Sequence, residues 1–162
     1  MLPIQFKFDK MKKNMIIVIG ILFCCSVNGQ KVPNLNLSFN HLSLSVKDLN
    51  HTANFYKNVL GLQEISNRTK KDGIRWFSLG EGKELHLISL LKDTVIINKA
   101  VHFALTTINF DLLIKTLIQN KVAYNDWPGI PNKISIRADG IKQVYFQDPN
   151  GYWIEVNSVG QK

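Results

Sequence analysis

Two segments of the chain alternate between hydrophobic and polar residues, and each carries a histidine near its start. In residues 39–46, FNHLSLSV, three aliphatic side chains alternate with His41 and two serines. Residues 101–107, VHFALTT, begin in the same way with His102. A period of two residues is typical of a strand with one buried face. Strand geometry places both histidines on the face opposite the hydrophobic side chains.

An amphipathic helix and further strands follow each of these two segments. Asp48 is the predicted N-cap of a helix over residues 49–61, which Gly61 ends. A second helix is predicted over residues 110–121. Aligning His41 with His102 brings the two helices into register without a gap, which predicts a duplicated βαβββ unit and an α+β fold. The other predicted strands are 62–66, 74–80, 84–90, 122–126, 141–147 and 152–158.

The beginning of the chain has the pattern of a secretory signal peptide. Residues 11–30, MKKNMIIVIGILFCCSVNGQ, contain lysines, then an apolar run, then small residues. This run is shorter than the roughly 20 residues needed to cross a bilayer. We predict that translation starts at Met11 and that cleavage follows Gly29. Residues 1–30 are then an extension and signal peptide, 31–38 a lead-in, 39–158 the domain and 159–162 a tail.

Cysteine usage and charge narrow the compartment and the partners. Cys24 and Cys25 are the only cysteines and lie inside the signal segment, so the mature protein has no disulfide. We therefore predict export to a bacterial periplasm or cell exterior. Residues 1–29 contribute +3 of the formal charge of +8, through four lysines and one aspartate, which leaves about +5. The remaining lysines are scattered, so we predict no nucleic-acid partner, and no membrane partner after cleavage.

The last strand of each half adds one more polar side chain. Its neighbours in the strand are hydrophobic, so it also lies on the face opposite the hydrophobic side chains. His86 lies between Leu85 and Leu87, and Glu155 lies between two aliphatic residues. His41, His86, His102 and Glu155 thus share the face that the helices do not cover. Three imidazoles and one carboxylate suit a divalent metal ion of borderline hardness. A single histidine on a strand is more often an ordinary polar residue, and His51, which has no such counterpart, is interpreted as structural.

Several segments resemble the vicinal oxygen chelate superfamily, which includes glyoxalase I, fosfomycin-resistance proteins, extradiol dioxygenases and bleomycin-binding proteins. The resemblance covers residues 39–158 and implies a module over 39–90 and another over 101–158. It also implies a cupped mixed sheet with the helices outside, and metal ligands at His41, His86, His102 and Glu155. The segments that carry it are NHLSLSVKDLNHTANFYKNVLGL, FSLGEGKELHLIS, VHFALTT and QDPNGYWIEV.

The resemblance implies a metal-dependent enzyme acting on a small substrate with adjacent oxygens. Four protein ligands leave two neighbouring positions on a six-coordinate ion, which zinc, nickel, iron, manganese or cobalt would satisfy. Glu155 is then both a ligand and a proton-transfer base. We expect a glyoxalase-like lyase or isomerase, with Trp153 and Arg137 as substrate contacts. Since His86 stands where glyoxalase I has a glutamate, and the first helix lacks arginine, glutathione-dependent activity is not expected.

Two other functions and one structural choice stay open. Without His86, the set of His41, His102 and Glu155 is the facial triad of a ring-cleaving dioxygenase or a fosfomycin-type transferase. A protein that only sequesters a ligand in the cup would use the same fold without catalysis. The two modules either close on each other within one chain or exchange between the subunits of a homodimer.

Overall fold

A computed structural model describes residues 36–90, 93 and 95–159. The predicted signal peptide and start site, and residues 160–162 of the predicted tail, lie outside these residues. The described residues from Phe39 onward form one compact unit. Residues 36–38 are exposed and have no regular secondary structure.

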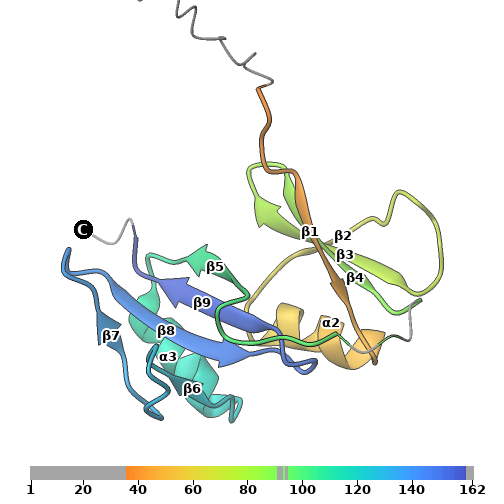
Figure 1. Cartoon of the computed structure of the whole chain (residues 1–162). Helices are drawn as coiled ribbons and strands as arrows, with labels where there is room; N and C mark the ends of the chain where they lie inside the picture. Colours follow the sequence, from red (N-terminus) through yellow and green to blue (C-terminus); the bar gives the residue numbers. More distant parts are fainter. Residues whose placement is uncertain (1–35, 91–92, 94, 160–162) are drawn as a thin grey trace, which may run out of the picture. The chain divides into compact units, whose positions relative to one another are not determined.

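The first module has the strands and the helix in the predicted order. It consists of β1 (His41–Ser45), α2 (Leu49–Asn58), β2 (Glu64–Ile65), β3 (Ile74–Gly80) and β4 (Lys83–Ile88). The strands form a sheet in the order β1-β4-β3-β2, with β1 parallel to β4 (Figure 1). The Asp48 side chain accepts a 2.9 Å hydrogen bond from the backbone N–H of His51, which confirms the predicted N-cap.

The second module repeats this plan and adds one short strand. It consists of β5 (His102–Thr106), α3 (Phe110–Gln119), β6 (Tyr124–Asn125), β7 (Ser135–Ile136), β8 (Lys142–Gln147) and β9 (Trp153–Asn157). The sheet order is β5-β9-β8-β6, with β5 parallel to β9 and β7 paired to β8. The α+β class and the two βαβββ modules are therefore confirmed, with a separate mixed sheet in each module.

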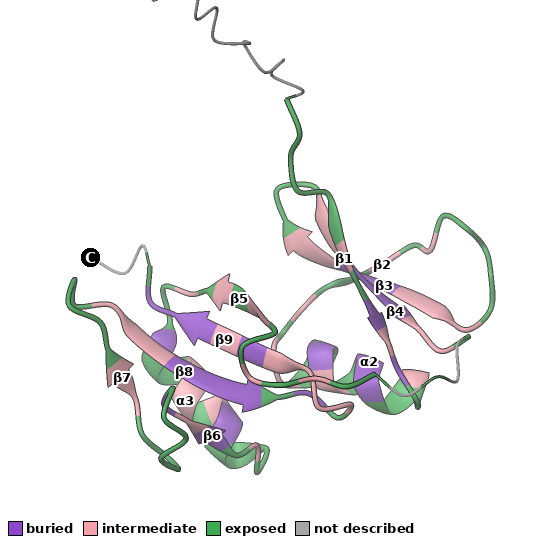
Figure 2. Ribbon diagram, viewed as in Figure 1, coloured by how far each residue is buried: buried purple, intermediate pink, exposed green. Residues whose placement is uncertain are grey.

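One hydrophobic core connects the two modules. Its members come from both helices and both sheets, and Figure 2 shows buried residues, in purple, on each of these elements. The hydroxyl of Tyr56, on α2, donates a 3.0 Å hydrogen bond to the buried carboxylate of Asp148, which follows β8. The fully buried members of the core are Ala53, Tyr56, Phe77, Leu85, Leu87, Phe110, Leu117, Val144, Phe146 and Ile154.

Strand pairing within each sheet determines which polar side chains become neighbours. In both modules the first strand lies parallel to the last strand, although a helix and two strands separate them in the first module and a helix and three strands in the second. His41 therefore lies beside β4, and His102 lies beside β9. Neither helix in the described residues has the length and apolar character needed to span a membrane.

Candidate functional site

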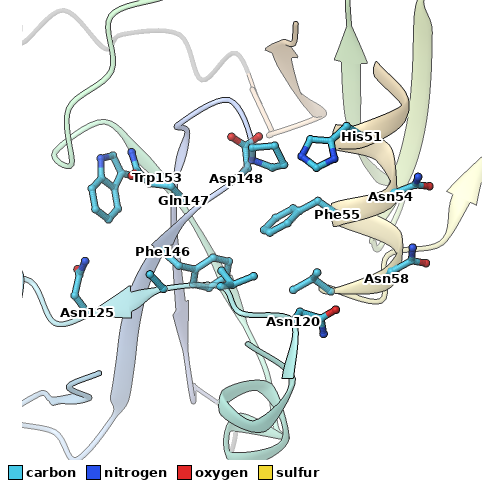
Figure 3. A pocket seen from close by; sticks show the side chains of 14 residues that line it. His51, Asn54, Phe55, Asn58, Asn120, Asn125, Phe146, Gln147, Asp148 and Trp153 are labelled. Atoms are coloured by element: carbon cyan, nitrogen blue, oxygen red, sulfur yellow. The ribbon is translucent and has the colours of Figure 1, made fainter. Parts of the chain in front are cut away.

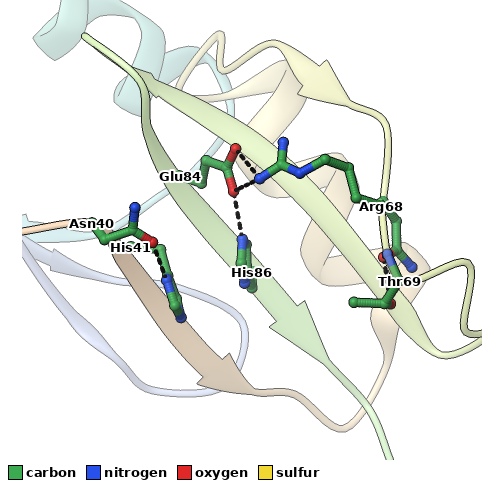
Figure 4. Close-up of polar contacts among 7 residues, drawn as sticks. Asn40, His41, Arg68, Thr69, Glu84 and His86 are labelled. Atoms are coloured by element: carbon green, nitrogen blue, oxygen red, sulfur yellow. Dashed lines mark hydrogen bonds and ion pairs between the residues drawn. The ribbon is translucent and has the colours of Figure 1, made fainter.

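The first module brings His41 and His86 together on one sheet face. His41 Nδ1 donates to Oδ1 of Asn40 at 2.7 Å, which leaves Nε2 free (Figure 4). His86 Nε2 lies 2.9 Å from Oε2 of Glu84, and that carboxylate also accepts from Arg68 Nη2 at 2.8 and 3.0 Å. The hydrogen bond from His86, followed by that from Arg68, lowers the pKa of Glu84. Glu84 is therefore a carboxylate acceptor and His86 Nε2 is the donor.

The two histidine rings belong to a column of stacked planar groups. The His86 ring lies 4.0 Å from the Trp76 ring at an interplanar angle of 7°. On its other side, the His41 ring lies 4.4 Å away at 17°. The guanidinium of Arg68 covers the outer face of Trp76 at 4.5 Å. Trp76 and His86 are buried, whereas His41 is exposed at the end of the column.

The second module brings His102 and Glu155 together. Nε2 of His102 lies 3.5 Å from Oε2 of Glu155. Two donor atoms that each lie about 2.1 Å from one metal ion at a tetrahedral angle are about 3.4 Å apart. The spacing and chemistry of this imidazole–carboxylate pair therefore fit a shared divalent cation.

Neighbouring groups hold both of these side chains in a ligand-competent orientation. His102 Nδ1 donates to the carbonyl of Lys99 at 3.0 Å, so Nε2 keeps its lone pair. Both oxygens of Glu155 accept hydrogen bonds, Oε2 from the hydroxyl of Tyr145 at 2.7 Å and Oε1 from Asn157 at 3.0 Å. Burial, together with the hydrogen bond to Glu155, raises the pKa of Tyr145, so its hydroxyl remains a donor at neutral pH.

Lys99, which precedes β5, anchors the segment that follows β6. Its ammonium donates to Oδ1 of Asn125 and to the backbone carbonyls of Asp126 and Trp127. It also lies 4.8 Å from the Tyr145 ring and 4.9 Å from the Trp153 ring. Burial lowers the pKa of Lys99. The indole of Trp127 is thereby held near His102, with 6.0 Å between the ring centres.

The two predicted substrate contacts differ in their surroundings. Trp153 lies beside the Lys99 ammonium, next to the His102–Glu155 pair. Arg137 lies in the turn after β7 and forms a 2.7 Å ion pair with Asp139. Substrate contact at either residue stays a prediction.

A single chain gathers the four predicted ligands as two pairs. Among the described residues, no group of three or more His, Cys, Asp or Glu side chains is arranged to hold a metal ion. His41 pairs with His86, and His102 pairs with Glu155. Metal ligation by any of them stays a prediction.

Sequence reasoning missed Tyr145, Lys99 and Asn157. Tyr145 lies directly opposite Glu155 across the β8–β9 hairpin, and counting back from the Asp148–Gly151 turn would have located it. Asn157 lies two residues after Glu155 on β9, so the two side chains share one face of the sheet. Lys99 lies outside any strand, so no periodicity points to it.

A cavity of about 520 Å³ has Trp153, the strand neighbour of His102, in its lining. Figure 3 shows α2 residues, among them His51 and Phe55, along one side of it, and Phe146 and Asn125 from the second module along the other. None of the four predicted ligands lines this cavity.

Comparisons with known proteins identify the relatives of this chain. Residues 38–156 match the family model described as the Glyoxalase/Bleomycin resistance protein/Dioxygenase superfamily. The chain is 31% identical over 125 residues to the metallothiol transferase FosB of Staphylococcus epidermidis, an alignment that covers 75% of this chain and 81% of that protein.

Solved structures agree with these sequence matches. A glyoxalase/dioxygenase from Nostoc punctiforme superimposes with a TM-score of 0.63 at 26% identity, over 82% of this chain and 98% of that one. The oxidase ChaP-H2 superimposes with a TM-score of 0.64 at 21% identity, over 76% and 94% of the two chains. The latter likeness concerns the fold alone.

Proposed function

The chain belongs to the glyoxalase/bleomycin resistance protein/dioxygenase superfamily, and we propose that it is a divalent-metal-dependent transferase that adds a thiol to a small oxygen-chelating substrate. The observation that carries this proposal is the His102–Glu155 pair, in which hydrogen bonds with neighbouring groups orient both side chains. The likeness to a metallothiol transferase supports the choice of reaction.

The proposed metal site takes its third ligand from a second copy of the chain. His102 and Glu155 provide two ligands, and the free Nε2 of His41 of the partner subunit provides the third. In a twofold-symmetric dimer, each such exchange is matched by an identical one, which gives two equal sites. Large hydrophobic side chains that are exposed close to the two pairs support a buried subunit contact there. They are Phe39, Val101 and Trp127.

The surroundings of Glu155 favour thiol transfer over the lyase chemistry expected from sequence. A carboxylate that shuttles protons must be within hydrogen-bond reach of the substrate proton and must have an oxygen available to accept it. The hydroxyl of Tyr145 and the amide of Asn157 occupy one oxygen each of Glu155. Such a carboxylate suits a fixed ligand that holds the metal's charge in one place.

In the proposed reaction, the sulfur of a thiol bonds to an electrophilic carbon of the substrate while a carbon–oxygen bond at that carbon breaks. The thiol proton ends on the released oxygen, so the thiol adds across the bond without an oxidant. A bound divalent ion supplies the positive charge that stabilises the oxygen anion as it forms. His102 and Glu155 fix the position of that charge, and the rings of Tyr145 and Trp127 exclude water from one side of His102.

We also propose that the protein acts after export, because residues 11–30 have the order of regions found in a signal peptide. N-terminal sequencing of the protein secreted or released from the periplasm tests this. A mature N-terminus near Gln30 supports export, and retention of residues 1–30 in the cytoplasm contradicts it.

Elemental analysis combined with a thiol-consumption assay tests the proposed function. We expect about one equivalent of divalent metal per chain, lost in His102→Ala and Glu155→Gln, together with metal-dependent loss of free thiol in the presence of a chelating electrophile. Oxygen uptake with an iron-loaded protein would favour a dioxygenase instead. Isomerisation of a chelating substrate without thiol consumption would favour a lyase or isomerase. Ligand binding that is unchanged in His41→Ala and His102→Ala would favour a sequestering protein.

A further inference from the structure

His86 and His41 have parallel rings that face each other, and this limits what the two can bind together. A metal ion lies close to the plane of an imidazole ring, about 2.1 Å from the ligating nitrogen. Two planes inclined by only 17° and about 4 Å apart meet more than ~10 Å away. No single ion can therefore lie in both ring planes at bonding distance, so only one of the two histidines is a ligand of any one ion.

Contacts of the two rings identify which histidine is the ligand. Both faces of His86 are covered, one by Trp76 and the other by His41, and its Nε2 is bonded to Glu84. His41 has one covered face, a tethered Nδ1 and an exposed position. The side chain that is available to an ion from outside is His41.

We propose that His86 is a positioning residue that holds the His41 ring at the angle required for ligation, and that it does not bind the metal. This inference rests on the metal site proposed above. His86 acts through stacking, because the Trp76 ring lies behind it and Arg68 lies behind Trp76. The indole N–H of Trp76 is buried and has no acceptor within the described part of the chain, so ring contacts rather than a hydrogen bond hold the indole.

The proposal changes the ligand count and therefore the number of positions open to the substrate. Three protein ligands, two imidazoles and one carboxylate, leave a divalent ion with a net charge of +1 and three open positions in six-coordinate geometry. A bidentate anion would fill two of these positions. The third would stay open for water or for a thiol. The four-ligand set expected from sequence leaves only two positions. The net charge is +1 for both sets, because an imidazole ligand is neutral, so the difference between them is one more open position.

The test compares His86→Phe with His86→Ala in the purified protein. Phenylalanine keeps a flat ring in the column but cannot bind a metal ion, whereas alanine removes the ring. We expect His86→Phe to retain the wild-type zinc stoichiometry, with a Kd within about threefold, and His86→Ala to bind zinc about 10- to 100-fold more weakly. If alanine prevents folding, His86→Gln replaces it, since glutamine keeps a donor for Glu84 without a ring.

A second readout separates this proposal from the proposed function. The 15N NMR signals of the His41 ring should report a proton on Nδ1 in wild type and in His86→Phe, and a mixture of tautomers in His86→Ala. If the wild type binds no metal, the proposed function fails and this tautomer pattern still decides the role of His86. Equal loss of zinc in Phe and Ala variants would make His86 a ligand and overturn the proposal. Unchanged binding and an unchanged tautomer in both variants would also overturn it.

Discussion

Tyr145 and Glu155 face each other across the β8–β9 hairpin, and the tyrosine hydroxyl donates a 2.7 Å hydrogen bond to Oε2 of the glutamate. Gln143 in turn donates to that hydroxyl at 3.1 Å. The carboxylate is therefore the end of a short chain of oriented groups. This arrangement gives Glu155 a defined position before any ligand arrives.

Removing the Tyr145 hydroxyl should weaken metal binding without unfolding the protein. In Tyr145→Phe, Oε2 of Glu155 loses its donor and the carboxylate gains rotational freedom, so we expect a 10- to 100-fold weaker zinc Kd. Tyr152→Phe is the matched control, because its hydroxyl bonds to the backbone of Ser45 instead. Zinc titration should show the loss in Tyr145→Phe only. Equal Kd values for the two variants would remove Tyr145 from the site.

Lys99 should be important for stability because its ammonium has three oxygen acceptors. Lys99→Met keeps the length of the side chain but leaves these acceptors unpaired, and we expect the free energy of unfolding to fall by about 1–3 kcal/mol. Trp127 should become more exposed and its fluorescence should shift to longer wavelength. Lys115→Met, on the exposed face of α3, is the control and should change neither quantity. Urea titration followed by tryptophan fluorescence measures both.

The Tyr56–Asp148 hydrogen bond should couple the first helix to the last hairpin. Tyr56→Phe removes one donor, and we expect a cost of about 1 kcal/mol. Asp148→Ala should cost about 2 kcal/mol or more, because it leaves the hydroxyl of Tyr56 and the backbone N–H groups of Asn150 and Tyr152 without their acceptor. In a double-mutant cycle, the combined cost should be clearly less than the sum of the two. Strict additivity would show that the bond does not stabilise the folded state.

Acid should loosen the column at His41 and His86 through Glu84. Hydrogen bonds from His86 and Arg68 hold the pKa of Glu84 below its usual 4.5, so the folded state binds this proton less tightly than the unfolded state. The contribution of Glu84 to stability is then present above pH 4.5 and is lost as the pH falls through the lower folded pKa. We expect the free energy of unfolding to rise between about pH 3 and about pH 5.5 more in wild type than in Glu84→Gln. Parallel curves for the two proteins would contradict this.

Much of the fold followed from alternation and repetition. β3 was predicted with its observed bounds, and β1, β5, β8 and β9 were predicted to within one or two residues, because each has one buried face. The two-residue strands β2, β6 and β7 could not be delimited. Strands this short are defined by the neighbour that they pair with, and that pairing is a tertiary property.

The candidate site was only partly predictable for a related reason. The alternation of side chains along the strands placed His41, His86, His102 and Glu155 on the sheet face that the helices do not cover. Alternation does not determine how a ring is oriented on that face. The 17° stacking of His41 on His86 depends on the register of β1 with β4 and on Trp76 behind them. Repeat symmetry also does not say whether equivalent residues meet within one chain or between two chains.

The central claim is that each metal site combines His41 of one subunit with His102 and Glu155 of the other, and mixing two defective variants tests it most directly. His41→Ala and His102→Ala should each bind almost no metal. When the two variants are co-expressed, half of the dimers are mixed and each mixed dimer contains one intact site, so about one quarter of the wild-type metal content should return. If metal binding does not return in isolated mixed dimers, the shared site is wrong.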